Sequence, residues 1–462
     1  MVQRRACKKR SPAASGSEIS RPVQRSTVEP GSHRRAQDHY GVNARLLLAQ
    51  PTGVTMSDTM SPTEIDEFRA RCRSFLDENA TGMNMGGDPD PRGSKRLEYG
   101  QIFQKALTEA GLAGLTYPKE YGGQGLTKEH ERIWREEYGN YPNMTFEFTI
   151  SHGMCLPMLA EYGTHEQKAA YLADNISGEK VWCQMFSEPG AGSDVASLQT
   201  KAERDGDTWV INGQKVWTTL AHVSDYGVII ARTDASVPKH AGISMFIVPL
   251  DAPGVEIRPI HQIDGGKHFN EIFFTDVSIP ADNLLGDLNN GWNMATAMLM
   301  YERVAIGSGA VSGVRHERAD QLIEQAQKLG KIEDPVVRDR LMKLYIMETT
   351  ASLVSMRTRA ELKAGKTPGP GGSLGKLIGT NNMNFARDLS LELIGPGSVA
   401  WDGESGGGWA RTALTGLQGG IAGGTNEIQR NIIGDRVLGL PRDIDVSKNV
   451  PFSELKVGTQ RD

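Results

Sequence analysis

The segment DTWVINGQKVW, residues 207–217, gives the clearest secondary-structure signal in this chain of 462 residues. Apolar and polar residues alternate on both sides of Asn212-Gly213, and both of these residues accept the positive φ angles of a tight turn. We therefore expect two short antiparallel strands joined at Asn212-Gly213. Four further runs with a period of two follow, at 226–232, 243–250, 255–260 and 271–279. The interval from about 183 to 291 is expected to form a small antiparallel sandwich or barrel.

Helical periodicity flanks this interval on both sides. The first helix starts at Ser61-Pro-Thr-Glu64, a sequence typical of a capping box. Its apolar positions recur at steps of three and four residues: Ile65, Phe68, Cys72, Phe75 and Leu76. Helices are expected up to about residue 180, and again at 292–329, 334–364, 372–394 and 425–438. This order differs from the strand-helix alternation of a nicotinamide-binding doubly wound sheet.

The predicted fold class is therefore an α+β multidomain protein. We expect an α-helical domain at 58–182, an antiparallel β domain at 183–291, and a helical bundle with a tail at 292–462. Cys7, Cys72, Cys155 and Cys183 form no CxxC or zinc-type spacing, which predicts a reducing compartment and no structural metal. No run approaches the ~20 consecutive apolar residues of a membrane-spanning helix. The sequence thus predicts a soluble, cytoplasmic protein without a membrane partner.

Residues 1–57 differ in composition from the rest of the chain. Residues 1–55 carry ten Lys or Arg and three Asp or Glu, a net +7, so the remainder of this −5 chain carries −12. The acidic body argues against nucleic-acid binding. The basic segment is expected to be a disordered extension or, because Met56 and Met60 follow it, sequence outside the working protein. The alternative is a mitochondrial presequence, which would place the protein in the matrix.

Two motifs of the predicted β domain carry the candidate ligand site. QMFSEPGAGSD, residues 184–194, has glycines that let a ligand approach the backbone closely, although an ordinary strand followed by a glycine-rich turn has the same composition. KVWTT, residues 215–219, places an indole beside two hydroxyl groups. A flat aromatic ring next to hydrogen-bonding hydroxyls suits a planar cofactor.

With these motifs the chain resembles the acyl-CoA dehydrogenase family from about residue 60 onward. Five segments occur in the family's order and spacing: YPKEYGGQG (117–125), QMFSEPGAGSD, KVWTT, GDLNNGW (286–292) and AGGTNEIQR (422–430). The resemblance implies an N-terminal helical domain, a middle β domain and a C-terminal four-helix bundle. It also implies FAD as cofactor, an acyl-CoA substrate, electron transfer to an electron-transfer flavoprotein, a role in fatty acid metabolism, and a dimeric or tetrameric assembly.

The resemblance also implies roles for individual residues. Those expected to contact FAD are Gln184, Met185, Phe186, Ser187, Trp217, Thr219, Thr425 and Glu427. Among them, Trp217 packs on the isoalloxazine, and Thr425 and Glu427 hold the diphosphate and adenosine end. Ser193 faces the acyl-CoA. A core indole and a solvated carboxylate at a helix start are the alternative interpretations of Trp217 and Glu427.

The catalytic base is expected on another element than in many members of the family. Those members place a glutamate directly before the Gly-Thr of the C-terminal motif, where this chain has Gly423. Glu302 lies in the apolar helix predicted after Gly291 and has Met298, Leu299 and Ile306 as helical neighbours, so burial would raise its pKa toward that of a base. Isovaleryl-type and long-chain-type members resemble this arrangement. We expect Glu302 to be the base and Arg303 to orient the substrate; a surface Glu302–Arg303 ion pair is the alternative.

One segment departs from the family pattern. An Arg-x-x-Phe-Gly segment commonly reaches FAD in a neighbouring subunit, but the aligned positions here are Ala326, Leu329 and Gly330. The segment ELIGPG, residues 392–397, matches the second cross-subunit contact in part. Two alternatives to a complete dehydrogenase follow. The chain is one subunit of a heteromeric enzyme that supplies part of the site, or it is a flavin oxidase or monooxygenase with the same fold.

Overall fold

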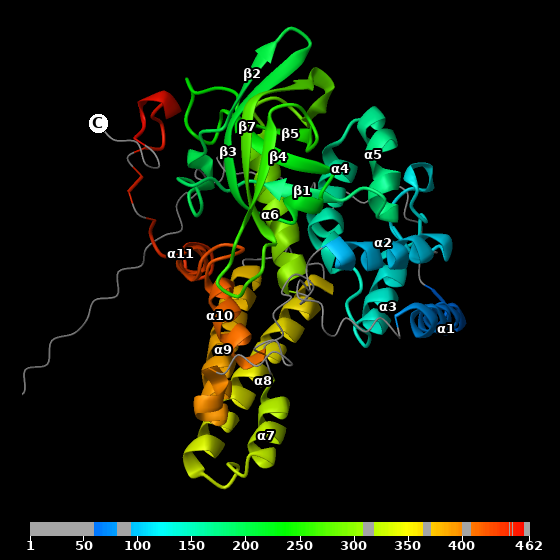
Figure 1. The fold of residues 1–462 in the computed structure, drawn as a ribbon, viewed down its shortest axis with the longest axis vertical. Helices are drawn as coiled ribbons and strands as arrows, with labels where there is room; N and C mark the ends of the chain where they lie inside the picture. The colour runs from blue at the N-terminus through cyan, green and yellow to red at the C-terminus, as the bar shows by residue number, and fades with distance from the viewer. Residues whose placement is uncertain are drawn as a thin grey trace, which may run out of the picture. The chain divides into compact units, whose positions relative to one another are not determined.

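The computed structural model describes residues 60–80, 94–307, 318–363, 371–399, 408–442, 444–445 and 447–456 (Figure 1). The predicted basic extension at 1–57 lies outside these described residues. None of the helices within the described ranges has the length and hydropathy of a membrane span.

Helices form the amino-terminal part of the described chain. Ser61 caps the first helix as predicted: its hydroxyl accepts a hydrogen bond from the Glu64 N–H at 3.3 Å, and the Glu64 carboxylate accepts one from the Ser61 N–H at 2.7 Å. Each bond satisfies a backbone or side-chain group at the helix start. The helices of this part are α1 (Pro62–Asn79), α2 (Ser94–Glu109), α3 (Lys128–Tyr138), α4 (Leu156–Tyr162) and α5 (His165–Ser177), and a π-helical turn (Ser151–Cys155) precedes α4.

A single sheet follows in the middle of the chain. Its strands are β1 (Trp182–Met185), β2 (Lys201–Asp205), β3 (Thr208–Thr219), β4 (Tyr226–Arg232), β5 (Ile243–Pro249), β6 (Val255–Ile260), β7 (Phe269–Pro280) and β8 (Leu284–Leu285). They are ordered β6-β7-β3-β2-β4-β5-β8, with β1 added beside β4. Most pairs are antiparallel, whereas β4 pairs in parallel with β1 and β2. The predicted antiparallel β domain is therefore present, with two parallel pairings around β4.

The predicted hairpin turn at Asn212-Gly213 is wrong. β3 runs without interruption from Thr208 to Thr219, and the β2–β3 turn lies instead around Gly206, whose φ is 53°. Around Asn212 the pairing between β3 and β7 shifts by one residue: Asn212 alone faces Thr275 and Asp276, so the extra residue of this β-bulge lies on β7. Gly213 has φ 150° and the opposing Asp276 has φ 50°. Gly213 and Asp276 thus have the positive φ angles at this bulge, and Asn212 does not; a bulge and a tight turn both need such residues, so Gly213 suits either structure.

Helices return after the sheet. They are α6 (Gly291–Gly307), α7 (Ala319–Lys328), α8 (Pro335–Lys363), α9 (Gly371–Ile394), α10 (Gly408–Thr415) and α11 (Asn426–Arg436). The predicted helix at 292–329 thus covers two helices, and residues 308–317 between them lie outside the described part. α9 contacts α6, α8, α10 and α11, and α7 packs on α8. Buried leucines and alanines of α7, α8 and α9 form a separate core for this bundle.

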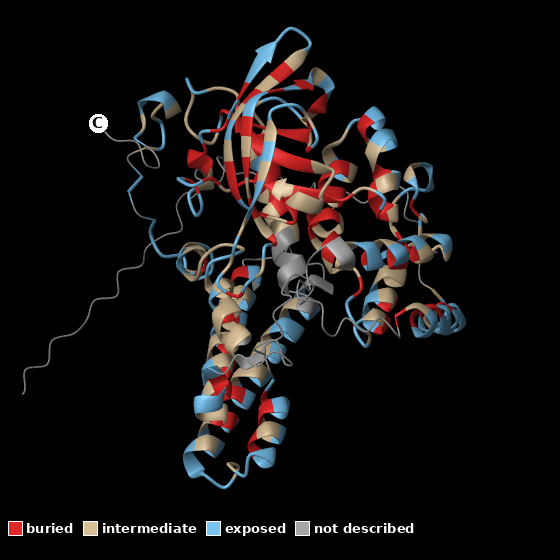
Figure 2. Ribbon diagram, viewed as in Figure 1, coloured by how far each residue is buried: buried red, intermediate tan, exposed pale blue. Residues whose placement is uncertain are grey.

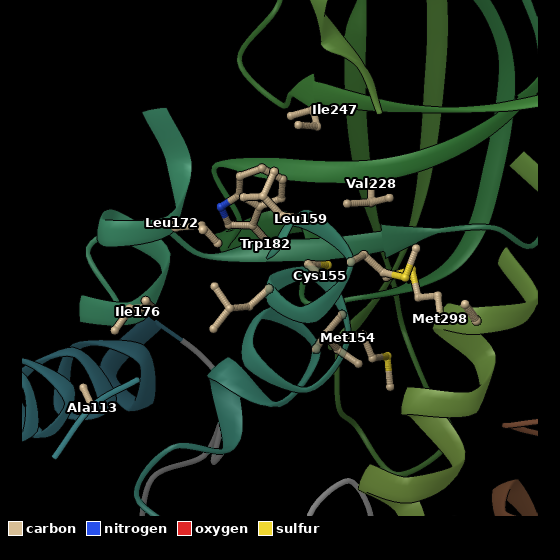
Figure 3. Packing of buried hydrophobic residues seen from close by; sticks show 14 of the residues in the cluster. Ala113, Met154, Cys155, Leu159, Leu172, Ile176, Trp182, Val228, Ile247 and Met298 are labelled. Atoms are coloured by element: carbon tan, nitrogen blue, oxygen red, sulfur yellow. The ribbon is translucent and has the colours of Figure 1, made fainter. Parts of the chain in front are cut away.

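The sheet is buried on both faces near β4 and β5 (Figure 2). Val228 and Ile247 belong to one large core with α6 and the amino-terminal helices, whereas Ile229 and Val248 face a second core inside the β domain. Figure 3 shows Trp182 of β1, Val228 of β4 and Met298 of α6 in the first of these cores. Successive residues of a strand point to opposite faces of the sheet, so the apolar strands β4 and β5 contribute side chains to both cores. α6 is thereby fixed against the sheet.

Candidate active site

The end of β1 places the first predicted FAD contacts beside β3. The Val216 N–H donates to the Ser187 carbonyl at 2.9 Å, which joins the two motifs. Gln184 and Ser187 are half-buried, but the side chains of Met185 and Phe186 are buried in the two cores. Of these four residues, Gln184 and Ser187 therefore have side chains near the surface, and Met185 and Phe186 offer their backbone.

A buried ion pair that was not predicted joins the segment after β1 to β3. Lys215 Nζ lies 2.8 Å from a Glu188 carboxylate oxygen, and the two residues are 0% and 8% exposed. Lys215 also donates to the Phe186 carbonyl at 3.1 Å, while Glu188 accepts from the N–H groups of Gln199 at 2.7 Å and Thr200 at 3.0 Å. Burial opposes ionisation of Glu188, but Lys215 and the two N–H groups together hold the pKa of its carboxyl below its usual value.

A sequence signal for this pair existed. Trp209, Ile211 and Lys215 alternate along β3, and the first two are buried apolar residues. A lysine in register with core positions needs a buried partner, because an unpaired buried charge is strongly unfavourable. Glu188, in the other motif, is that partner.

Trp217 projects from a second bulge between β3 and β7, whose extra residue lies on β3. Val216 and Trp217 together oppose the single residue Glu271 of β7, and Trp217 has φ 61°. A bulky residue costs about 1–2 kcal/mol in this left-handed backbone region. The indole is nevertheless 58% exposed, and its packing includes an edge-to-face contact with Phe269 at 6.0 Å between ring centroids. The alternative interpretation of Trp217 as a core indole is therefore wrong.

Hydroxyl groups stand next to this indole. Thr219 is half-buried at the end of β3, and the chain turns there because Leu220, with φ 61°, donates to the His268 carbonyl at 2.7 Å. The Thr218 hydroxyl is buried and has no hydrogen-bond partner among the described residues. An exposed flat ring on a strained backbone, two residues from Thr219 and next to the Val216–Ser187 backbone bond, fits a planar heteroaromatic group.

The predicted substrate residue Ser193 lies in an exposed loop. We call residues 188–197 the glycine loop. Ser193 is exposed, and a Cβ built on Gly192 meets no atom within 4 Å, so the loop is open on this side. Beyond Ser193 the loop is anchored by Asp194, whose carboxylate oxygens accept from Lys239 Nζ at 2.8 and 2.7 Å.

α6 carries the predicted base. Met298 is fully buried and Leu299 is half-buried in the large core, as the predicted apolar face requires. Tyr301 donates to the Glu161 carboxylate at 2.6 Å and so ties α6 to α4. The side chains of Glu302 and Arg303 lie outside the described residues, and the structure gives their place on the helix alone.

The C-terminal motif forms the start of α11. Thr425 is the N-cap and accepts from the Ile428 N–H at 3.3 Å, while Gly423 and Gly424, with φ 66° and 84°, turn the chain into the helix. Glu427 is exposed and forms an ion pair with Arg430 at 3.1 Å. α11 packs on α9. The structure therefore brings Gln184, Ser187, Trp217 and Thr219 together on the sheet and places Thr425 and Glu427 on the bundle.

The departures from the family pattern also have clear structural positions. Ala326 is fully buried in the bundle core, Leu329 is the C-cap residue after α7 and is 41% exposed, and Gly330 has φ 65°. Glu392, in the partly matching segment, forms an ion pair with Arg340.

A helical domain, a β domain and a helical bundle follow one another in the order found in flavin-dependent acyl-CoA dehydrogenases. The chain belongs to the acyl-CoA dehydrogenase family, since models of that family's N-terminal, middle and C-terminal domains match residues 62–179, 183–277 and 289–438. Members bind FAD, which is therefore the cofactor, and the residues around Trp217 fit it. When bound, FAD supplies the oxidising power of the reaction.

Individual relatives support this assignment over most of the chain. Acyl-CoA dehydrogenase IpdE1 of Mycobacterium tuberculosis is 39% identical over 82% of this chain and 99% of its own length. The mitochondrial long-chain specific acyl-CoA dehydrogenase of Mus musculus is 28% identical over 90% and 96%. A solved steroid acyl-CoA dehydrogenase, Tcur3481-Tcur3483, aligns with TM-score 0.68 at 29% identity, covering 83% and 99%. The ChsE4-ChsE5 complex of Mycobacterium tuberculosis aligns with TM-score 0.65 at 31% identity, covering 84% and 100%.

Proposed function

We propose that this enzyme dehydrogenates an acyl-CoA thioester to a trans-2-enoyl-CoA, with Glu302 as the base and an electron-transfer flavoprotein as electron acceptor. Trp217 carries the proposal for the flavin site: an exposed indole held in a strained bulge beside Ser187 and Thr219. Gln184 and the backbone of 185–187 would hold the same group, and Thr425 and Glu427 its diphosphate and adenosine end.

The backbone at Gly423 supports a base on α6. Gly423 has φ 66°, in the left-handed region. A glutamate at this position would cost about 1–2 kcal/mol in the same conformation. Glu302 instead follows Met298 by one helical turn on a helix fixed in the large core. A base on this element would need apolar surroundings, because burial is what raises the pKa of a carboxylate toward the range of a base.

In the proposed reaction, one side chain removes a proton and two others orient the substrate. The Glu302 carboxylate accepts the proton from the carbon next to the thioester carbonyl, and Arg303 and Ser193 orient the thioester. Packing of α6 against the sheet would exclude water from the reacting carbons, which strengthens electrostatic interactions there.

Anaerobic flavin bleaching tests the base. In Glu302→Gln, FAD content stays at the wild-type level, but reduction by acyl-CoA slows by at least about 10²-fold, the scale of general-base catalysis. Glu324→Gln on α7 is the matched control, because Glu324 pairs with Lys328 on an exposed helix surface. Bleaching of Glu302→Gln at the wild-type rate would refute the assignment.

We also propose that the enzyme is heteromeric and accepts ring-bearing CoA thioesters. The buried Ala326 leaves no arginine to reach a neighbouring FAD from this position. α8 offers an apolar stripe at helical spacing whose members are each more than half exposed: Met342, Tyr345, Ile346, Leu353 and Met356. Such a stripe suits a bundle partner. The named steroid enzyme and the two-chain complex among the relatives support both parts of the proposal.

Purification of the chain alone tests the assembly. A heteromer predicts less than one FAD per chain and weak bleaching until a related chain is supplied. One FAD per chain with full turnover in a homo-oligomer would refute it. Bleaching by a panel of short, branched, long and ring-containing CoA thioesters then identifies the substrate class; slow bleaching by every ring-containing thioester would refute the preference.

A further inference from the structure

The loop between β4 and β5, residues 233–242, connects two parts of the proposed site. Lys239 holds Asp194 of the glycine loop with two contacts of 2.8 and 2.7 Å. His240 packs edge-to-face on Trp292, in the first turn of α6, at 4.6 Å between ring centroids. The β4–β5 loop therefore contacts both the loop of Ser193 and the helix that carries Glu302.

The carboxyl-terminal segment, residues 447–456, is paired with this loop. The Phe452 N–H donates to the Val237 carbonyl at 2.9 Å, and the Ser453 N–H donates to the Ala235 carbonyl at 2.9 Å. Pro451 forms a β-bridge with Pro238. Backbone pairing of this kind fixes the register of both segments.

Arg232 joins the carboxyl-terminal segment to the glycine loop. Its guanidinium carbon lies 3.8 Å from the centroid of the Phe452 ring, within cation–π distance. The same guanidinium donates to the Ala196 carbonyl at 2.7 Å and the Leu198 carbonyl at 3.3 Å, and it also bonds the Lys239 carbonyl. Arg232 is 5% exposed. Phe452 thus covers a buried cation that holds both loops.

We propose that Phe452 is a positioning residue for acyl-CoA binding: by packing on Arg232 it fixes the glycine loop, and with it Ser193, in the geometry that the substrate requires. The inference rests on the proposed function for its kinetic consequence. Its structural part, the coupling of the carboxyl-terminal segment to residues 188–197, stands on the contacts of Arg232 and Phe452.

The effect is expected in substrate binding. A cation–π contact with a desolvated arginine is worth about 1–2 kcal/mol, which corresponds to about a five- to thirtyfold change in an equilibrium constant. In Phe452→Ala we expect KM for the best acyl-CoA of the panel to rise by about fivefold or more, with kcat changed by less than about twofold. Phe452→Trp keeps an aromatic face over the guanidinium and is expected to restore KM.

Phe273→Ala is the matched control. Arg258 lies over the Phe273 ring at 4.4 Å, an arginine–aromatic contact in the same domain, on β6 and β7. This control removes an arginine–aromatic contact in which the arginine side chain is 56% exposed, and it leaves residues 188–197 and 233–242 untouched. KM is expected to stay at the wild-type value.

Hydrogen exchange of the FAD-loaded enzyme gives a second readout that does not need turnover. Phe452→Ala is expected to speed amide exchange in residues 195–198 and 233–242. In the first range, the N–H groups of Ser197 and Leu198 donate to the carbonyl oxygens of Asp194 and Val195. Unchanged exchange there in Phe452→Ala, or an equal increase in Phe273→Ala, overturns the coupling. Faster exchange with unchanged KM overturns the positioning role. Failure of every thioester to bleach the wild-type flavin, both in the chain alone and after a related chain is supplied, refutes the proposed function instead, and exchange still decides the coupling.

Discussion

Lys215→Met would leave the Glu188 carboxylate buried without its cation. Removing one partner of a buried ion pair typically costs 3–5 kcal/mol. Glu188 keeps its two backbone donors, at 2.7 and 3.0 Å, so we expect a loss near the lower end, about 3 kcal/mol. Such a loss is a large part of the stability of a folded domain, which is about 5–15 kcal/mol.

Urea denaturation at pH 7 measures this loss as a lower midpoint. Lys201→Met is the matched control, since Lys201 pairs with Glu203 at the same 2.8 Å but the two side chains are 52% and 63% exposed. An exposed pair contributes about 0–1 kcal/mol. A midpoint for Lys215→Met that falls no further than that of Lys201→Met would refute the reasoning.

The difference in stability between the wild type and Lys215→Met is also expected to depend on pH. In the wild type the pKa of Glu188 is held below 4.5, so the stability from the pair is complete above that pH and is lost as pH falls through the native pKa. In Lys215→Met, burial without a cation raises the pKa of Glu188, so the variant is destabilised most at neutral pH. The gap in stability between the two proteins should therefore narrow from pH 7 toward pH 4. A constant gap would contradict the assignment of the pair.

Two further substitutions test the strained positions of β3. Trp217→Ala should lower FAD retained per chain, measured by visible absorbance, while changing the free energy of unfolding by no more than about 0.5 kcal/mol, because the indole is exposed. Wild-type FAD content would show that the indole does not contact the flavin. Gly213→Ala should lower the melting temperature, since its φ is 150° and a Cβ would lie 2.7 Å from Thr200 Cα, costing about 1–3 kcal/mol. An unchanged melting temperature would contradict the bulge geometry.

Local sequence signals were sufficient where the relevant contacts are local. The Ser61 capping box and the apolar face of α1 depend on residues three or four positions apart, and both are confirmed. Asn212-Gly213 shows the limit of such signals, because turns and bulges both need residues that tolerate positive φ. A turn forms where the chain reverses and pairs with itself, and a bulge forms where the strand continues along its neighbour. β3 continues along β7 past Gly213, so a bulge forms there.

The candidate site was predicted through its motifs, but the interactions that rigidify it were not. Glu188 and Lys215 are far apart in the chain, and alternation along β3 marks Lys215 as buried without naming its partner. The contact between Arg232 and Phe452 has no sequence signal, since each residue lies in an unremarkable local pattern. A contact between side chains of two distant segments can be recognised only once the topology that brings the segments together is known.

The position of Phe452 has a consequence for biosynthesis. Domains generally fold as units as the chain leaves the ribosome, and the amino-terminal ones fold first. Most strands of the β domain emerge well before residues 447–456, yet Val237 and Ala235 in the loop at 233–242 accept backbone hydrogen bonds from Phe452 and Ser453. The sheet can therefore form early, whereas the final arrangement of these loops must wait until residues 447–456 have left the ribosome. A nascent chain stalled before residue 447 would contain the complete sheet with residues 233–242 still unpaired to the carboxyl-terminal segment.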